Sequence, residues 1–297
     1  MTAAFQLPFF QTAALATLVL AGLHAYLGFH VVRRGVLFVD LALAQMAALG
    51  VAIALVFGKE PEDPMTFACA LGMTFLGAML FSWLRGRSRN VPLEAFIGIV
   101  FATAQASAFL LLEKNPSGAE HLKETLVGSL FTLDPKLIVR VALLYAGIAI
   151  LHFALRKPFF EITKDARAAK EHGRKLFLWD FLFYATFGLV VTLSVQIAGV
   201  LLVFGLLVIP AAAGLLATSR TGGALAIGWI FGFLAGVVGL LLSVQADLPA
   251  APSILVTLTA MLAVWAVIVA TMRRLRHAPH AELEKTPAAE VAGVGVH

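Results

Sequence analysis

Residues 156–219 read RKPFFEITKDARAAKEHGRKLFLWDFLFYATFGLVVTLSVQIAGVLLVFGLLVIPAAAGLLATS. A segment rich in charged residues is followed directly by two apolar runs, and the second run contains Pro210 with small residues after it. Apolar runs of about 20 residues are long enough to cross a bilayer as helices. The stretch therefore predicts a cytoplasmic loop that leads into membrane-spanning segments.

The composition of the whole chain also indicates a membrane protein. Of the 297 residues, 60% are hydrophobic and only 13% are charged, whereas soluble domains average about 45–50% apolar and about 25% charged residues. We expect an all-α, polytopic helical bundle. Nine segments have the length and character of a spanning helix, at residues 11–32, 37–57, 65–84, 93–112, 137–155, 178–197, 199–218, 223–243 and 253–272.

The number of crossings depends on the sixth and seventh segments. They meet at Ala198 and Gly199 with almost no connection, so one broken helix, and eight helices in all, is the alternative. If the N-terminus lies outside, nine crossings place 17 of the 22 Lys and Arg residues on one side, as expected of cytoplasmic loops. Eight crossings would leave the basic sequence RRLRH, residues 273–277, outside. We therefore favour nine helices, with the N-terminus outside and the C-terminus in the cytoplasm.

The chain divides into one domain and a tail. Residues 1–272 form the predicted transmembrane domain, with a cytoplasmic loop at 156–177. Residues 273–297 are rich in Ala, Pro, Glu and Gly beyond their basic start and predict a disordered cytoplasmic tail.

Several classes of function are disfavoured by the motifs that the sequence lacks. It contains no phosphate-binding loop, no H-E-x-x-H and no G-x-S-x-G, so nothing predicts an enzyme or an ATP site on this chain. Cys69 is the only cysteine. The basic residues lie in short loops between apolar segments, which does not favour a nucleic-acid partner.

Four stretches, in the same order, resemble the membrane-spanning permease subunits of the zinc/manganese/iron family of ABC importers, the ABC-3 family. They are VVRRGVLFVDLALAQMAALGVAIA at 31–54, LEAFIGIVFATAQASAFLLL at 93–112, AGVLLVFGLLVIPAAAGLLA at 198–217 and DLPAAPSILV at 247–256. The resemblance implies a permease that imports a divalent transition metal, namely zinc, manganese or iron, across a bacterial cytoplasmic (inner) membrane. It also implies a dimer with itself or a paralogue, an ATP-binding ABC subunit, and an extracytoplasmic metal-binding protein. The metal would be the substrate, and this chain would hold no cofactor.

The segment FEITKDARAAKEHG, residues 160–173, is similar to the family's loop that docks an ATPase subunit through a short coupling helix. The residues themselves predict such a helix. Ala166 and Ala169 favour it, Asp165 can cap its start and Gly173 can end it. The alternative is an ordinary basic loop beside the membrane.

Candidate residues for the metal path come from the second segment. The family has an Asp and a His four residues apart there, on one helical face. Aligned on Gly50, Gln45 takes the position of the His, but Asp40 lies one residue before that of the Asp. At about 100° per residue these two side chains diverge by about 140°, and Gln is a poorer zinc ligand than His. The alternatives are a helix cap for Asp40 and an interhelical hydrogen bond for Gln45.

Other polar residues in the apolar segments have weaker signals. His24 is a third candidate for the metal path, with a hydrogen bond to a neighbour as its alternative. His30, Asp40, His152 and Asp180 lie near the ends of segments, where we expect water to be close. Pro210 predicts a kink near the path.

Two further hypotheses concern packing and mechanism. Gly232 and Gly236 have the spacing that lets helices approach closely, for packing within one subunit or for dimerisation. The competing function is a self-sufficient secondary transporter or channel for a small cation. It would favour carboxylates deep within the bundle, and the segments carry few.

Overall fold

The computed structural model describes residues 6–85, 87, 91–113, 128 and 130–283, and every regular element within these ranges is helical. Eight of the described helices are long and apolar enough to cross a membrane. They are α1 (Pro8–Arg34), α2 (Val39–Val56), α3 (Pro64–Leu84), α4 (Leu93–Leu112), α6 (Pro135–Ala154), α9 (Leu176–Ala217), α10 (Thr221–Ala246) and α11 (Ala250–Leu283). Three short elements connect them: η2 (Leu130–Thr132), α7 (Arg156–Lys164) and α8 (Ala166–Glu171).

Local signals in the sequence set several helix ends. Asp63 accepts a hydrogen bond from the backbone N–H of Met65 at the start of α3, and Asp134 does the same for Lys136 at the start of α6. Gly35 ends α1 with φ of 67°, a conformation that costs glycine little. The predicted segments coincide with helical stretches to within a few residues, except that α11 continues past the predicted end at residue 272 to Leu283.

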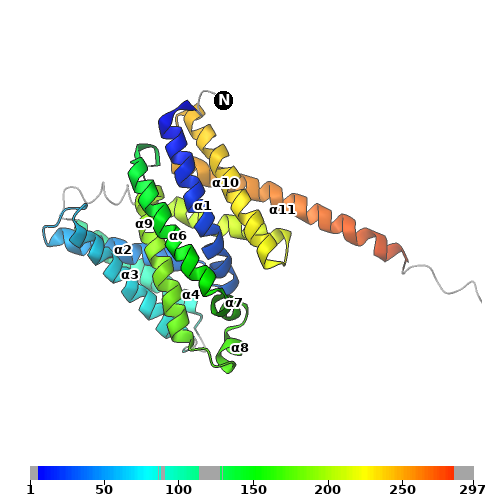
Figure 1. Cartoon of the computed structure of the whole chain (residues 1–297), viewed down its shortest axis with the longest axis horizontal. Helices are drawn as coiled ribbons and strands as arrows, with labels where there is room; N and C mark the ends of the chain where they lie inside the picture. Colours follow the sequence, from blue (N-terminus) through cyan, green and yellow to red (C-terminus); the bar gives the residue numbers. More distant parts are fainter. Residues whose placement is uncertain (1–5, 86, 88–90, 114–127, 129, 284–297) are drawn as a thin grey trace, which may run out of the picture.

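The longest helix, α9, is the centre of the bundle. It contacts α1, α2, α3, α10 and α11, and Figure 1 shows it passing behind α1 and α6. At Gly199 the backbone has φ of 73° and ψ of 158°, which breaks the helix into arms at 176–198 and 200–217. The predicted sixth and seventh segments are thus one broken element, and eight described helices rather than nine meet the criterion for spanning. The side on which each terminus lies stays a prediction.

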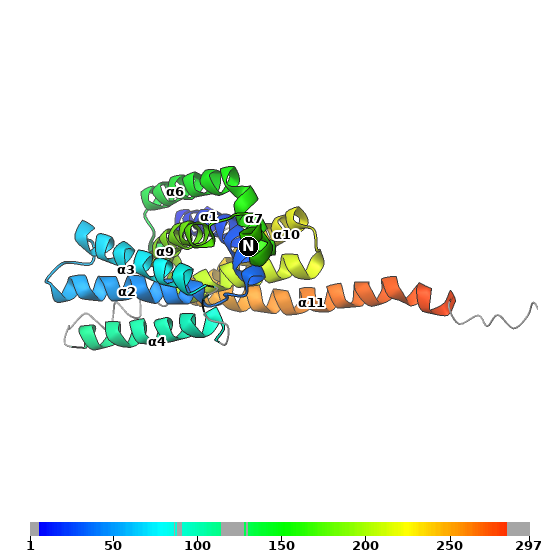
Figure 2. The ribbon, with the colours of Figure 1, turned by 90° about the horizontal axis from the view of Figure 1, so that it is seen from below.

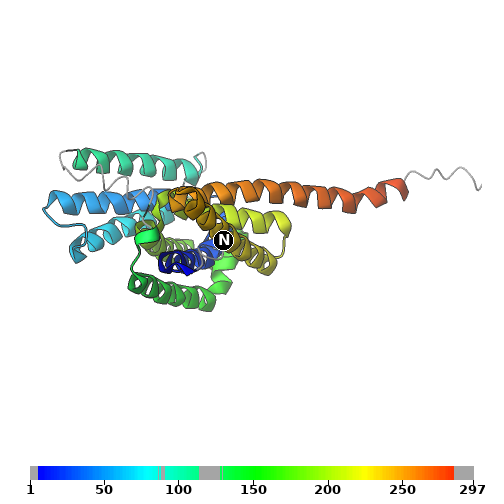
Figure 3. The same cartoon turned by 90° about the horizontal axis from the view of Figure 1, so that it is seen from above.

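The other helices flank this centre. α2 packs between α3 and α4, and Figures 2 and 3 show this group together at one end of the molecule. α11 projects beyond the bundle in both views and runs to Leu283. The helix therefore includes the first residues of the predicted tail, and residues 284–297 of that tail lie outside the described part of the chain.

Small residues let α1, α9 and α10 approach closely. A Cβ at Gly28 would lie 1.9 Å from the backbone oxygen of Leu207 in α9. Cβ atoms at Gly232 and Gly236 would meet the Pro210 ring and the methyl group of Thr17 at 2.9 and 2.3 Å. This glycine pair therefore packs within the subunit, as one of the two hypotheses predicted.

Candidate functional site

α7 and α8 form the loop between α6 and α9, where the sequence predicted a single short helix. Asp165 separates them. Its extended backbone ends α7, and its Oδ1 accepts hydrogen bonds from the N–H groups of Arg167 and Ala168, at 2.8 and 3.1 Å, to begin α8. Gly173, with φ of 81°, follows the last turn of α8, and the next N–H bonds back to the carbonyl of Ala169. The cap and the end predicted for this helix are confirmed as local structure.

Glu161 of α7 contacts two residues that follow α8. Its Oε1 lies 3.0 Å from Nδ1 of His172, and its Oε2 accepts a hydrogen bond of 2.9 Å from Nε of Arg174. These hydrogen bonds hold the pKa of Glu161 below its ordinary value, first through His172 and then through Arg174. The pKa of Asp165 is lowered by the N–H groups that it caps. Two carboxylates thus give the loop a defined shape.

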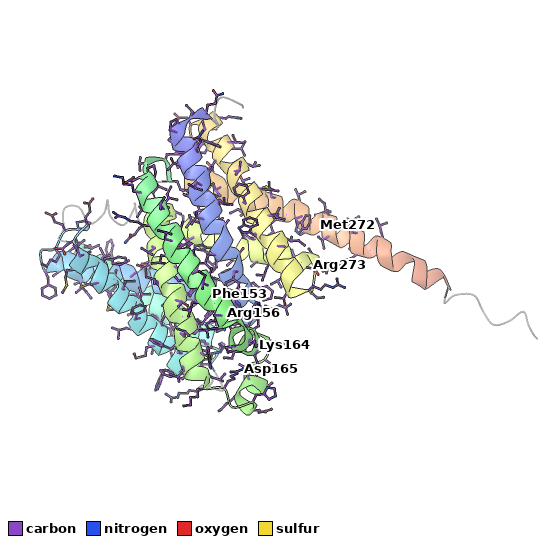
Figure 4. The ribbon with its side chains drawn as sticks, in the orientation of Figure 1. Phe153, Arg156, Lys164, Asp165, Met272 and Arg273 are labelled. Carbon is purple, nitrogen blue, oxygen red and sulfur yellow. The ribbon has the colours of Figure 1, made fainter. Side chains whose placement is uncertain are left out.

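The outer surface of the loop is basic. Arg156, Lys164 and Lys170 are exposed, whereas Ala169 is fully buried. In Figure 4, Lys164 and Asp165 lie at the lower end of the molecule, below Arg156, whose guanidinium lies over the Phe153 ring at 4.4 Å. The labels for Met272 and Arg273 mark α11, apart from this loop. A partner would therefore contact the charged side chains rather than Ala169.

The inner surface of α7 packs on three spanning helices. Phe159 stacks on His152 of α6, with ring centroids 4.6 Å apart, and lies 5.9 Å from the Phe183 ring of α9. Phe160 lies 4.6 Å from the ring of His30 in α1. Aromatic side chains thus pack α7 against the end of the bundle.

A buried hydroxyl adds a polar connection. Thr163 Oγ1 lies 2.7 Å from Nδ1 of His30 and accepts a hydrogen bond of 2.9 Å from Nε of Arg34. On the other side of α7, Nε2 of His152 lies 2.8 Å from Oγ1 of Thr186 in α9. Both histidines therefore use their ring nitrogens to join helices.

Arg34 continues this connection into a buried ion cluster. Its Nη1 lies 3.0 Å from Oδ1 of Asp180, and Nη1 of Arg85, which follows α3, lies 2.6 Å from the same oxygen. The side chains of Arg34 and Asp180 are at most 1% exposed. The Arg34 guanidinium also lies 4.0 Å above the Phe183 ring. The cluster joins α1, α3 and α9 at the end of the bundle that carries the loop.

The expectation that His30, Asp40, His152 and Asp180 lie close to water is wrong for this subunit, since all four are at most 1% exposed. His30, His152 and Asp180 are buried because α7 folds across the ends of α1, α6 and α9. Their partners are far away in the sequence, as in the Arg34–Asp180 pair, so no local spacing marks the cluster. The sequence indicates this cluster only through the charged residues that lie at the ends of several apolar segments.

The candidate metal-path residues do not form a ready coordination sphere. Among the described residues, no three His, Cys, Asp or Glu side chains gather as a metal site. His24 is buried in α1, and its Nδ1 donates a 2.7 Å hydrogen bond to the carbonyl of Leu20. A neutral ring with its proton on Nδ1 leaves the lone pair on Nε2, and this atom has no described hydrogen-bond partner. The hydrogen bond that was the alternative for His24 is therefore present.

Asp40 and Gln45 lie on α2, which is a regular helix here. Phe38 takes the capping position and Asp40 lies in the first turn, buried, with neither carboxylate oxygen bonded to a described group. Gln45 is 5% exposed. Because the helix is regular, these two side chains diverge as predicted.

Pro210 lies within the second arm of α9. The only non-helical dihedral angles inside α9 are those of Gly199, so a kink at the proline stays a prediction.

The comparisons with known proteins agree with this architecture. The sequence model of the ABC 3 transport family matches residues 6–270, nearly the whole of the described fold. The chain belongs to the ABC 3 transport family. This permease is accordingly a multi-pass membrane subunit of a metal-transporting ABC system of the manganese, iron or zinc type, and not itself an enzyme.

Relatives of this permease carry names that refer to two metals. It is 25% identical to a "Probable iron transport system membrane protein" of Haemophilus influenzae, over 87% of this chain and 89% of the relative. It is 23% identical to the "Manganese transport system membrane protein MntC" of Listeria monocytogenes, over 80% and 82% of the two chains. A chain of "PsaBC from Streptococcus pneumoniae in complex with Fab" has the same fold, with a TM-score of 0.75, 22% identity and coverage of 89% and 93%.

Proposed function

We propose that this permease is the membrane subunit of an ATP-driven importer for a divalent transition metal, with Mn²⁺, Fe²⁺ and Zn²⁺ as the candidate substrates. Membership of the ABC 3 transport family is the observation that carries this proposal. The names of the relatives favour manganese and iron over zinc. Gln45 in place of a histidine also favours a metal that prefers oxygen ligands, such as manganese.

The α7–α8 loop is the proposed docking site for the ATPase subunit. It is a short, capped and charged element whose inner face packs on α1, α6 and α9. A rigid element of this kind passes on a rigid-body movement better than a flexible loop would. The concentration of basic residues around it supports a cytoplasmic location. ATP would bind to the partner, and this chain needs no cofactor of its own.

The proposed metal path includes Asp40, Gln45 and His24. Their support is burial combined with unused ligand atoms, since the oxygens of Asp40 and Nε2 of His24 have no described partner. Burying a polar group without a partner is costly, so such groups are rare and commonly have a function. A second copy or a paralogue would complete the path at a dimer interface, and an extracytoplasmic binding protein would deliver the metal.

Reconstitution into proteoliposomes tests the function. The permease would be inserted with and without its ABC ATPase, and uptake of Mn²⁺, Fe²⁺ and Zn²⁺ would be measured separately by elemental analysis, with the binding protein supplied outside. We expect uptake of at least one metal only when both ATPase and ATP are present. Equal uptake without the ATPase would instead support a secondary transporter or channel.

A further inference from the structure

The hydroxyl of Thr163 is the buried polar contact between α7 and α1. Thr163 is 7% exposed, and its Oγ1 meets Nδ1 of His30 and Nε of Arg34 at 2.7 and 2.9 Å. Both partners lie near the end of α1. The neighbouring aromatic residues of α7 hold the helix in place, but ring packing is tolerant of small shifts. The hydroxyl adds a contact that depends on direction and distance.

Arg34 extends this contact to the rest of the bundle. The guanidinium is a planar and rigid fork. It uses Nε for Thr163 and Nη1 for Asp180 in α9. A displacement of α7 that moves Nε must therefore also move the atom that pairs with Asp180. Through the Arg85 side chain on the same oxygen, the displacement reaches α3.

The ion cluster leaves one oxygen of Asp180 without a hydrogen-bond partner among the described residues. Both arginines contact Oδ1 of Asp180, whereas Oδ2 and Nη2 of Arg34 have no hydrogen-bond partner among the described residues. Arg34 and Arg85 thus share one oxygen of Asp180, while its other oxygen can still accept a hydrogen bond. Buried polar groups without partners are rare and commonly have a functional reason. Rotation of either guanidinium could move its bond to Oδ2 without leaving the Asp180 charge unpaired.

From these contacts we infer that Thr163 is a positioning residue for transport. It transmits the movement of α7 and α8 to α1 and, through Arg34 and Asp180, to α9 and α3. This inference rests on the proposed function, because it assumes that an ATPase drives the loop. The Thr163 hydroxyl is thus the link between the α7–α8 loop, on which the ATPase docks, and the spanning helices.

The variant Thr163→Val tests this role, since valine keeps the branched shape and removes the hydroxyl. Thr163→Ser restores the hydroxyl. Thr257→Val is the matched control, because Thr257 is equally buried on α11 but bonds only to Ser253 of its own helix. Each variant would be reconstituted with the ATPase and the binding protein. The measurement is the amount of metal imported per ATP hydrolysed, using the metal that the unaltered permease imports, together with the amount of ATPase that co-purifies.

We expect Thr163→Val to lower the ratio of metal to ATP about five-fold or more, the lower end of typical coupling effects, with unchanged ATPase binding. Thr163→Ser should recover most of the ratio, and Thr257→Val should match the unaltered permease. An unchanged ratio in Thr163→Val would overturn the inference, as would loss of ATPase binding, which would make Thr163 a docking residue. Absence of ATP-dependent uptake by the unaltered permease would instead refute the proposed function.

Discussion

At the scale of single residues, Asp40 is a buried carboxyl group without a described hydrogen-bond partner. Its oxygens lie at the first turn of α2 with no hydrogen bond to a described group, where the free N–H groups of the helix favour an anion. A carboxylate held in this way is available to a cation that passes along the helix. This supports a place for Asp40 in the metal path better than the capping role, which Phe38 occupies by position.

The variant Asp40→Asn should lower metal uptake. Asparagine has the same shape and lacks the charge, so we expect at least about a tenfold loss, equivalent to about 1.4 kcal/mol of lost cation stabilisation. Uptake in proteoliposomes measures the effect. Asp63→Asn is the control, because Asp63 caps α3 and Asn caps helices as well. Uptake by Asp40→Asn equal to that of the control would remove Asp40 from the path.

At the scale of elements, the break in α9 depends on Gly199. Its dihedral angles lie in a region that is essentially confined to glycine. Gly128 packs directly on this point, since a Cβ there would lie 2.4 Å from the backbone carbon of Ala198. A helix of 42 residues would measure about 60 Å if straight, twice the thickness of the apolar core. The break lets the chain turn while it remains inside the bundle.

The variant Gly199→Ala should destabilise the permease by about 1–3 kcal/mol, the usual cost of such a backbone conformation. Thermal unfolding in detergent would measure this as a lowered midpoint. Gly72→Ala is a matched control, because Gly72 lies within α3 and nothing lies within 4 Å of its would-be Cβ. If both variants unfold at the same temperature, the strain argument for Gly199 is wrong.

The two short helices should respond to pH through Glu161. The pKa of Glu161 is depressed in the folded loop. Its contribution to the stability of the loop is therefore present at pH values above the ordinary pKa of 4.5, and is lost as the pH falls through the pKa of the folded state. Hydrogen exchange across residues 161–175, corrected for intrinsic rates, should show protection at neutral pH that declines below pH 4.5. Glu161→Gln should lack this protection at neutral pH. Glu171→Gln, which alters an exposed carboxylate of α8, should retain it.

At the scale of the whole molecule, the charged outer face of the α7–α8 loop is the surface on which we propose that the ATPase docks. Ala169 faces inward, so its substitution would disturb α8 itself. We expect the charge reversals Arg167→Glu and Lys170→Glu together to reduce co-purification of the ATPase while membrane insertion is unchanged. Lys59→Glu, in the loop between α2 and α3, is the control. Full retention of the ATPase by the double variant would contradict docking at this loop.

Prediction from the sequence succeeded where the cause is local or compositional. Apolar length located the spanning helices, and the cap at Asp165 and the glycine at 173 located α8, because each depends on a few consecutive residues. The order of the motifs predicted the family, which the comparison confirmed. The loop charges favoured nine crossings, but they could not show that Gly199 divides one continuous element.

The sequence by itself therefore determined the class of fold, the helices, the charged loop and the family of this permease. Only the tertiary structure decided what the polar residues at the helix ends do. The Arg34, Asp180 and Arg85 side chains meet from α1, α9 and the end of α3. From α7, Thr163 contacts Arg34, and two phenylalanines contact His30 and His152. Such contacts depend on how helices pack across long separations in the chain, and nearly uniform apolar faces give no periodic signal for that packing.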